Sequence, residues 1–596
     1  MRRRLWLCAV LSVLPLAGCT TSDPKPGPSP VALPRPALEL VAFDSCARLL
    51  TELRAAASAN ADQFGQRPEA FAVEGSRAMS AAAEAVPAPT TYSGTNVHEQ
   101  GADEPDIVKT DGRRIVTVDQ GTLYVIDPAT RTRTGKLALG VTGDAQLLLA
   151  GDRALVLGTS YPAVQWRGYV PPEQATADAI LVDLTGTPRV ISRYRGVGRM
   201  VDARQTGDVA RVVLSTIPAI KFPMTADSGD DLLKSTRKAI NKAGVDAWLP
   251  QWEVTTGGVT SKGRMDCGAV SRPASFSGAT MLSVLTFDLA APALTDGSPV
   301  GVVADGDTVY GTPSSLYIAN DQRWRMTTRT GKAAPDTEIF KFALPAAGKP
   351  QYTAGGTVPG LLVNQYAMSE WDGYLRVATT DLSAQSSAVR VLASRGGKLT
   401  QVGVVSGLGK GEQIYSVRFI GARGYVVTFR QTDPLYSLDL GDPARPRVTG
   451  ALKITGYSAH LQPVGDNLLV GVGEEASAQG VRQGLQVSLF DVSDPASPRR
   501  LAQHVIPGTE SEAEFDPHAL LWWPATNLLV LPIAGSANGA VALHVTGGRI
   551  DEAGRPALGT VRRSLVVGDQ LWTLGDANLT VADLSTLDRV GTVRLT

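Results

Sequence analysis

The stretch LYSLDLGDPARPR at residues 435–447 occurs again, almost residue for residue, in LQVSLFDVSDPASPR at 485–499. A shorter version, AILVDLTGTPR, stands at 179–189. In each copy, an apolar and β-branched run predicts a strand, and the Asp and Pro that follow it predict a tight turn. The chain therefore contains true internal repeats, and the repeated unit is a β-strand that ends in a proline-containing turn.

A second signal lies before these strands, namely a turn of Gly and Asp, or a close variant, followed by a short apolar strand. Such turns favour hairpins, because they need residues that accept positive φ. The mean spacing of the turns is about 57 residues, close to the 40–50 residues of a β-propeller blade plus loop insertions. The nine candidate turns are at Asp111-Gly112, Gly151-Asp152, Gly207-Asp208, Asp305-Gly306, Asp372-Gly373, Gly421, Gly465-Asp466, Pro524 and Gly568-Asp569.

These repeats predict an all-β fold. A single repeat cannot bury both of its faces, so the repeats must pack into a closed ring. We predict one large β-propeller of seven to nine four-stranded antiparallel blades, preceded by a short N-terminal helix. The last repeat, which ends at residue 596, is expected to pack beside the first, near residues 106–127. An array of β-sandwiches is the alternative.

The first residues are typical of a secretion signal. Met1 is followed by three arginines, and the apolar run at 5–16 is shorter than the roughly 20 residues of a bilayer span. The run ends in the sequence Leu16–Cys19, Leu-Ala-Gly-Cys, which resembles the lipobox of bacterial lipoproteins. The resemblance implies a signal peptide over residues 1–18 and a lipid on Cys19, with the chain anchored to the extracytoplasmic face of the cell membrane. An ordinary signal peptide that happens to end near a cysteine is the alternative.

Two segments separate this anchor from the repeats. Residues 19–39 are rich in proline and cannot bury a core, so we expect an extended tether after the lipidated cysteine. Residues 40–94 are expected to form a helical N-terminal segment, because apolar residues at 3, 4 and 7 spacing predict an amphipathic helix over 44–59. The propeller domain is then expected over 95–596.

The cysteines indicate one cross-link. Of the four, Cys8 is lost with the signal peptide and Cys19 takes the lipid. Cys46 and Cys267 remain as a pair in a protein exported to an oxidising compartment, which predicts a disulfide between them. Two buried free thiols are the alternative.

The longest insertion in the propeller domain is expected over residues 217–280. It contains a predicted helix over 230–244, followed by Trp248 and Trp252. A basic amphipathic helix with two tryptophans is compatible with a binding lip. We favour the alternative, a cap on one face of the propeller.

The charge balance limits the kind of partner. The chain has 57 Lys and Arg against 57 Asp and Glu. Nucleic-acid binding needs a basic excess to neutralise phosphates, so we expect no nucleic-acid partner.

The stretch TNVHEQGADEPDIVKTDG at residues 95–112, called the opening motif below, is the most specific signature in the chain. It resembles the motif that opens the first blade in a family of secreted bacterial and archaeal β-propeller proteins. That family usually has Gln and Val where this chain has His98 and Ala102. The resemblance extends from about residue 40 to the end and includes cysteines like Cys46 and Cys267. It implies a propeller fold and no particular activity.

Several polar residues of the opening motif are candidates for a site. One interpretation is a Ca²⁺ site, because carboxylate oxygens are the ligands that Ca²⁺ prefers, although the spacing is not that of an EF-hand. We favour a structural role, in which the motif satisfies backbone groups at the mouth of the channel and holds the first blade against the last. The weak metal candidates are Asp103, Glu104, Asp106 and Asp111, and the structural set adds Asn96 and Lys109.

No catalytic residue can be assigned from motifs. The chain has no Gly-x-Ser-x-Gly, His-Glu-x-x-His, Walker A or Cys-x-x-Cys sequence. None of the five histidines stands at metal-ligand spacing from another, and we interpret His518 as a hydrogen-bonded loop residue rather than a catalytic one.

Two classes of function therefore remain. The favoured one is a cell-surface lipoprotein that presents its propeller as a binding or scaffold module for an envelope protein or glycan. The alternative is an envelope hydrolase or lyase whose active site is built at the channel mouth from several blades. Acidic and basic groups with perturbed pKa values in one pocket would favour the enzyme, and Trp and Tyr gathered on one face would favour binding.

Overall fold

The computed structural model describes residues 38–63, 91–161, 175–222, 228–278, 280–321, 336–346, 348–429, 433–477 and 481–595. The predicted signal peptide, the lipidation site Cys19 and most of the predicted tether lie outside these residues. All described residues belong to one compact unit, Ala37–Thr596. Within the described ranges, no helix combines the length and the apolar character that a bilayer crossing requires.

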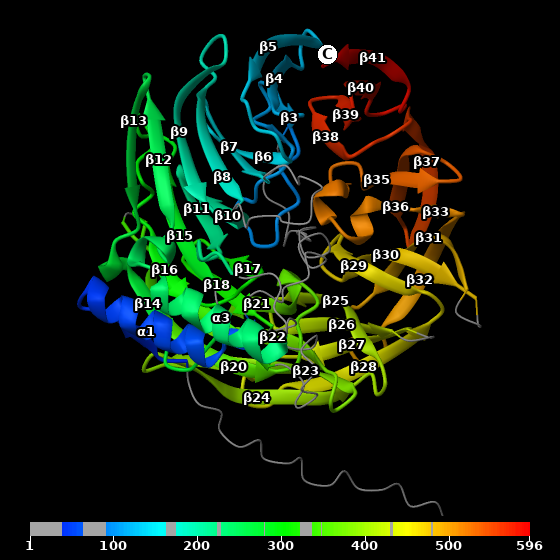
Figure 1. Cartoon of the computed structure of the whole chain (residues 1–596). Helices are drawn as coiled ribbons and strands as arrows, with labels where there is room; N and C mark the ends of the chain where they lie inside the picture. The colour runs from blue at the N-terminus through cyan, green and yellow to red at the C-terminus, as the bar shows by residue number, and fades with distance from the viewer. Residues whose placement is uncertain are drawn as a thin grey trace, which may run out of the picture. The chain divides into compact units, whose positions relative to one another are not determined.

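Antiparallel strands dominate the unit from Ala37 onward, and strands that follow one another in the chain mostly pair in the same sheet. Eight sheets form, and the eight-stranded one divides into two four-stranded halves that share a single parallel contact, between Gly355 and Lys398. The described residues thus make nine four-stranded blades, which Figure 1 shows arranged around a centre. The count is at the upper end of the predicted range.

The first three blades are formed by strands β2 to β11 together with β15 and β16. Blade 1 contains β2 (Val108–Thr110), β3 (Ile115–Asp119), β4 (Thr122–Asp127) and β5 (Thr132–Ala138). Blade 2 contains β6 (Ala145–Ala150), β7 (Arg153–Ser160), β8 (Thr176–Asp183) and β9 (Arg189–Val197). Blade 3 contains β10 (Arg199–Thr206), β11 (Val209–Thr216), β15 (Met281–Asp288) and β16 (Val300–Val303).

Blades 4 to 6 are each continuous in the chain. Blade 4 contains β17 (Thr308–Gly311), β18 (Ser315–Asn320), β19 (Asp336–Ala343) and β20 (Gln351–Pro359). Blade 5 contains β21 (Met368–Trp371), β22 (Tyr374–Asp381), β23 (Ser386–Arg395) and β24 (Lys398–Leu408). Blade 6 contains β25 (Gln413–Ile420), β26 (Arg423–Phe429), β27 (Asp433–Asp439) and β28 (Arg447–Ile454).

The last three blades follow the same order. Blade 7 contains β29 (Tyr457–Pro463), β30 (Leu468–Ala476), β31 (Arg482–Asp491) and β32 (Arg499–Pro507). Blade 8 contains β34 (Leu521–Trp523), β35 (Leu528–Gly535), β36 (Gly539–Thr546) and β37 (Arg549–Leu558), with the short β33 (Thr509–Glu510) also paired to β35. Blade 9 contains β38 (Arg563–Val567), β39 (Gln570–Leu574), β40 (Asn578–Asp583) and β41 (Arg589–Arg594).

Eight of the nine predicted turns connect the first and second strands of a blade. Their residues take the positive φ that such turns need, as at Gly112 (φ 81°) and Asn527 (φ 52°). The prediction at Asp305-Gly306 is wrong, because these residues lie between blades 3 and 4. Asp305 is buried there and accepts a hydrogen bond from the hydroxyl of Thr280 at 2.8 Å. The equivalent turn of blade 4 begins at Thr312, where a proline and serines replace the expected Gly and Asp.

The repeated proline turns pack against glycines of the preceding blade. A methyl group added to Gly450 of blade 6 would lie 2.5 Å from the carbonyl oxygen of Pro495 in the turn of blade 7. One added to Gly403 of blade 5 would lie 2.2 Å from the carbonyl oxygen of Pro443 in blade 6. The repeat therefore marks a contact between neighbouring blades as well as a turn.

The ring closes between the last blade and the first, as predicted. Ile115 and Tyr124 of blade 1 share a buried cluster with Trp572 and Val581 of blade 9. The guanidinium of Arg133 on β5 also donates a hydrogen bond to the carbonyl oxygen of Leu595.

The predicted N-terminal helix is α1 (Cys46–Ala59), which is capped by Ser45. Its buried face, with Leu49 and Leu53, packs against the insertion and blade 3. The predicted disulfide is confirmed, since Cys46 is bonded to Cys267 with a Cα–Cα distance of 5.2 Å. The short β1 (Leu40–Ala42) pairs with residues 271–273 of the insertion.

The predicted insertion, 217–280, extends two blades instead of forming a separate cap. Its helix α3 (Gly229–Lys242) packs beside α1 (Figure 1), and Trp248 between them is buried, so it forms no exposed lip. The hairpin of β12 and β13 pairs with β9 of blade 2, and β14 pairs with β16 of blade 3. The bounds of these strands are Gln251–Thr256, Val259–Arg264 and Val270–Pro273, and the short 3₁₀ helices are η1 (Ala61–Gln63), η2 (Val245–Ala247), η3 (Cys267–Ala269), η5 (Gln365–Ala367), η6 (Glu512–Glu514) and η7 (Pro517–Ala519).

Candidate functional site

Residues 91–107, called the channel segment below, run through the centre of the ring before blade 1 begins. Their backbone pairs in turn with Val567 of blade 9, Gln205 of blade 3 and Leu147 of blade 2, through Tyr92, Asp103 and Asp106. Asn96 reaches blade 7, where its side-chain amide donates to Gln462 Oε1 at 3.1 Å. The hypothesis drawn from the sequence linked this motif to the first and last blades, and the contacts extend to several others.

His98 is the residue of the channel segment that reaches blades 4 and 5. Its ring lies 4.6 Å from the ring of Tyr366 in a stacked arrangement and 5.0 Å from that of Tyr310. The neighbouring Glu99 accepts a hydrogen bond from the Tyr310 hydroxyl at 2.6 Å. Burial, with help from the nearby Arg418 charge, holds the pKa of His98 well below its usual range, so this histidine is neutral.

Glu104 forms a buried ion pair with two distant residues. Its Oε2 lies 3.1 Å from Nε2 of His518 in η7, and its Oε1 lies 3.5 Å from the guanidinium of Arg204 on β10. Burial alone would raise the pKa of Glu104, but Arg204 and His518 outweigh it and lower that pKa to about 2. Burial also opposes the charge of His518, and the surrounding carboxylates, Glu104 first, still raise its pKa. Glu104 is therefore ionised near neutral pH, and its charge favours the protonated form of His518.

Asp106 forms the second buried pair, with Arg563 at the start of blade 9. The distance between Arg563 Nε and Asp106 Oδ1 is 2.8 Å. Arg563 also pairs with Asp516 and, at 3.3 Å, with Glu512, both beside η6 and η7 of blade 8. Burial lowers the pKa of Arg563, and its three carboxylate partners raise it by more. The pair joins the channel segment to the last two blades.

The remaining carboxylates of the opening motif pair with other cations. Asp103 Oδ1 lies 2.7 Å from the ammonium of Lys109, which also donates to the carbonyl oxygen of Glu104. Asp111 accepts the backbone N–H groups of Arg113 and Arg114 at 2.9 Å and makes the predicted turn. Each of the four acidic residues thus has its own cationic partner. Over the ranges described, no three His, Cys, Asp or Glu side chains gather in a way that could hold a metal ion.

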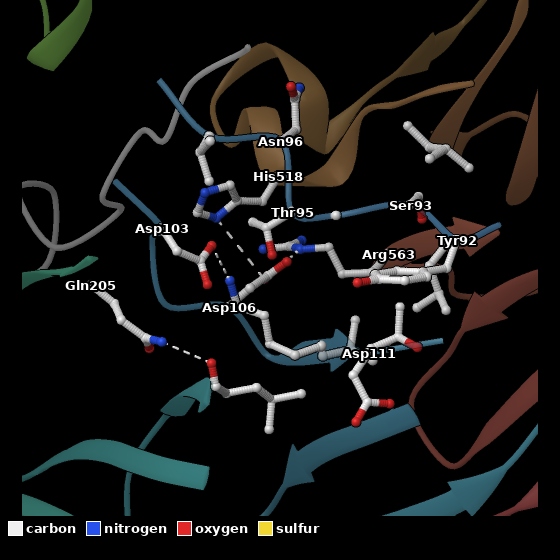
Figure 2. A pocket seen from close by; sticks show the side chains of 18 of the residues that line it. Tyr92, Ser93, Thr95, Asn96, Asp103, Asp106, Asp111, Gln205, His518 and Arg563 are labelled. Carbon is white, nitrogen blue, oxygen red and sulfur yellow. Dashed lines mark hydrogen bonds and ion pairs between the residues drawn. The ribbon is translucent and has the colours of Figure 1, made fainter. Parts of the chain in front are cut away.

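A pocket of about 440 Å³ opens beside these pairs, at the mouth of the channel. We call it the mouth pocket. The channel segment forms one wall, and the first turns of blades 1 to 3 and the start of blade 9 form the others. Figure 2 shows Asp106, His518 and Arg563 close together, with Gln205 and Tyr92 at opposite sides of the view. Its lining includes Tyr92, Gly94, Thr95, Asp103, Gln205 and Leu521.

Sequence reasoning found the acidic half of this site and missed most of the basic half. The structure places all six predicted residues of the opening motif in or beside the channel, with Lys109 buried and Asp111 in the first turn of blade 1. Arg204 and Arg563 were not predicted. Each of these arginines lies on the first strand of a blade, which could have been a signal. Arginines are also frequent on the other strands, so the sequence does not distinguish the two. His518 is hydrogen-bonded and buried, in line with its interpretation from the sequence.

Fold and site together define a β-propeller whose centre is filled by its own chain. A protein-family model, described as the beta propeller domain, matches residues 92–587, and the chain belongs to this family. The match begins at Tyr92, so it covers most of the channel segment as well as the blades.

Two archaeal relatives are described only as uncharacterised proteins. The one from Archaeoglobus fulgidus is 28% identical over 583 residues, which cover 86% of this chain and 86% of that protein. The one from Methanocaldococcus jannaschii is 36% identical over 266 residues, which cover 44% of this chain and 40% of that protein. The first match spans most of both chains.

Two solved structures resemble about half of the chain. The periplasmic gluconolactonase PpgL of Pseudomonas aeruginosa matches with a TM-score of 0.35 and 17% identity, over 52% of this chain and 91% of its own. Sqt1 of Saccharomyces cerevisiae matches with a TM-score of 0.35 and 9% identity, over 52% of this chain and 81% of its own. At these scores, the likeness carries no argument about activity.

Proposed function

We propose that this chain is an extracytoplasmic lipoprotein whose β-propeller serves as a binding or scaffold module for an envelope protein or glycan. The sequence around Cys19 supports the lipid anchor, and the proline-rich residues 20–36 support a tether. The disulfide between Cys46 and Cys267 supports export, because such bonds persist in oxidising compartments.

The observation that carries the proposal is that the charges at the mouth pocket are already paired. A general acid or base works best with a pKa near the operating pH. Glu104, with a pKa of about 2, instead stays ionised and pairs with Arg204 and His518. Glu514, whose pKa burial raises to about 7, does not line the pocket. The arrangement therefore suits recognition better than proton transfer.

A specific observation favours the second candidate, an envelope hydrolase or lyase. Several titratable groups with shifted pKa values converge beside one pocket, as active-site residues do. Their burial argues against it, since the side chains of Glu104 and His518 are only 2% and 1% exposed. If the protein is a hydrolase, an envelope fraction incubated with it should release soluble products, and His518→Gln should abolish that release.

Binding through the mouth pocket can be tested with a steric plug. Gly94 lines the pocket, has no positive φ, and a Cβ added there meets no atom within 4 Å. The unit from Ala37 onward, immobilised, should retain material from solubilised native envelope, and Gly94→Trp should abolish that retention. Gly186→Trp is the matched control, because Gly186 is an equally open glycine on a turn outside the pocket. Equal retention by both variants, or none by the wild type, would refute the proposal.

A further inference from the structure

We infer that the mouth pocket takes a neutral, hydroxyl-rich ligand, namely one or two sugar units of a glycan. This inference rests on the proposed binding function and specifies its ligand. Three features of the pocket carry it: the balance of its charges, the hydrogen-bonding groups that remain, and the apolar surface beside them.

The charged groups that line the pocket are already paired, so the ligand does not need to be ionic. The pocket is lined by the carboxylates of Asp103, Asp106 and Asp111. Each already has a cation within about 3 Å, at 2.7, 2.8 and 3.1 Å for Lys109, Arg563 and Arg114 respectively. A charged ligand would have to displace one of these partners or be desolvated without compensation, and both are costly. A neutral ligand requires neither.

Hydrogen-bonding capacity remains after these pairs are made. A carboxylate has about four lone-pair sites, so Asp103 and Asp106 can accept from ligand hydroxyls while they stay paired. The side-chain amide of Gln205 donates to the carbonyl oxygens of Leu149 and Gly207, both at 2.8 Å, which fixes its orientation. Its Oε1 then has no hydrogen-bond partner among the described residues, and a hydroxyl donor would satisfy it. The hydroxyl of Thr95 adds a group that both donates and accepts.

An apolar surface completes the pocket. Tyr92 contributes its ring, which packs on Gly112, where a methyl group would lie 2.6 Å from a ring carbon. Leu520, Leu521 and Leu565 line the pocket as well. A sugar ring presents C–H groups on its faces and hydroxyls at its edge, which matches apolar and polar walls in one pocket. The volume, about 440 Å³, lies within the roughly 300–1,000 Å³ of small-molecule sites.

The test is ligand-observed saturation-transfer NMR with the unit from Ala37 onward. The probes are neutral disaccharides of glucose, galactose, mannose and N-acetylglucosamine, with glucuronate and glucosamine as charged counterparts. We expect at least one neutral probe to bind and the charged sugars to bind at least tenfold more weakly. Thr95→Val keeps the shape and removes the hydroxyl, so it should weaken binding severalfold. Gly94→Trp should abolish binding, and Gly186→Trp should leave it unchanged.

The outcomes separate this inference from the proposed function. If no neutral sugar binds, or charged sugars bind as well, the inference is overturned. It is also overturned if the neutral probe still binds Gly94→Trp, because the sugar then lies elsewhere. Retention of envelope material that depends on Gly94 but is destroyed by protease would indicate a protein ligand. In that case the proposed binding function stands and the inference of a sugar ligand is wrong. If the wild type retains no envelope material, the proposed function and the sugar inference are both wrong.

Discussion

Replacement of Gly450 by alanine tests the contact between neighbouring blades in isolation. Gly450 lies on β28, and an added methyl group would lie 2.5 Å from the carbonyl oxygen of Pro495 and 2.7 Å from that of Ala496. Both atoms belong to the backbone of the repeated turn in blade 7, so neither can rotate away as a side chain would. The φ of Gly450 is not positive, so alanine fits the local backbone and any destabilisation by Gly450→Ala comes from the steric overlap.

The expected size of the effect follows from the overlap. A carbon atom needs more than 3.0 Å from such an oxygen, so the turn of blade 7 must move by about half an ångström or more. Overpacking of this kind typically costs about 1–3 kcal/mol. Gly450→Ala should therefore lower the free energy of unfolding by that amount. The change in the thermal midpoint is a few degrees at most, because the shift per kcal/mol decreases with chain length.

The assay is thermal and urea unfolding of the unit from Ala37 onward, with Gly186→Ala as the control. Gly186 lies in the corresponding turn of blade 2, has no positive φ, and a methyl group there meets no atom within 4 Å. Gly186→Ala should be neutral, or stabilising by up to about 1 kcal/mol through the unfolded state. If Gly450→Ala unfolds like the wild type, or if both variants lose the same stability, the packing account of the repeat is wrong.

Three further predictions concern the cross-link, the opening motif and pH. The Cys46–Cys267 bond closes a separation of 221 residues, so its removal should lower the free energy of unfolding by about 5 kcal/mol in the chain-entropy model. Reductant should therefore lower the melting temperature, and an unchanged melting temperature would contradict this prediction. Asp106→Ala removes one of the three carboxylate partners of the buried Arg563 and should lower the melting temperature equally with and without EDTA, whereas a wild type that EDTA destabilises and Ca²⁺ restores would instead indicate a metal site. Burial raises the pKa of Glu514 to about 7, so between pH 4.5 and 7 the carboxyl ionises in the unfolded state while it stays protonated in the folded state, and the free energy of unfolding falls as pH rises through this range. Glu514→Gln should therefore stabilise the protein at pH 8 and change little at pH 5, and equal effects at both values would show that the carboxyl does not titrate there.

The fold was predictable because its signals are local and repeated. Each blade carries its own turn, and eight of nine turn predictions lie between the first two strands of a blade. The failure at Asp305-Gly306 has a physical cause, since Asp305 accepts hydrogen bonds from the backbone N–H and the hydroxyl of the buried Thr280 instead of making a turn within a blade. The disulfide was predictable because the expected loss of Cys8 with the signal peptide and lipidation at Cys19 would leave Cys46 and Cys267 as the pair.

The pairing inside the channel was not predictable, because its members are far apart in the chain. Glu104 and His518 are separated by 414 residues, and Asp106 and Arg563 by 457. A single sequence shows that the opening motif is acidic, but it does not show which of the many arginines lie opposite. That information depends on the number of blades and on the angle that each blade takes around the ring, so it appears only once the ring has closed.

The buried pairs also bear on why the centre of the ring is polar. Removing two charges from water is expensive, and well-packed apolar residues often stabilise a core as well as an ion pair does. The pairs of Glu104 and Asp106 are therefore not required for stability alone. They fix the course of the channel segment, because Glu104 joins it to blades 3 and 8 and Asp106 joins it to blade 9. The same segment forms a wall of the mouth pocket, from Tyr92 to Val97 and again at Asp103 and Asp106. Apolar replacement of both members of one pair should for this reason change ligand binding more than it changes the free energy of unfolding.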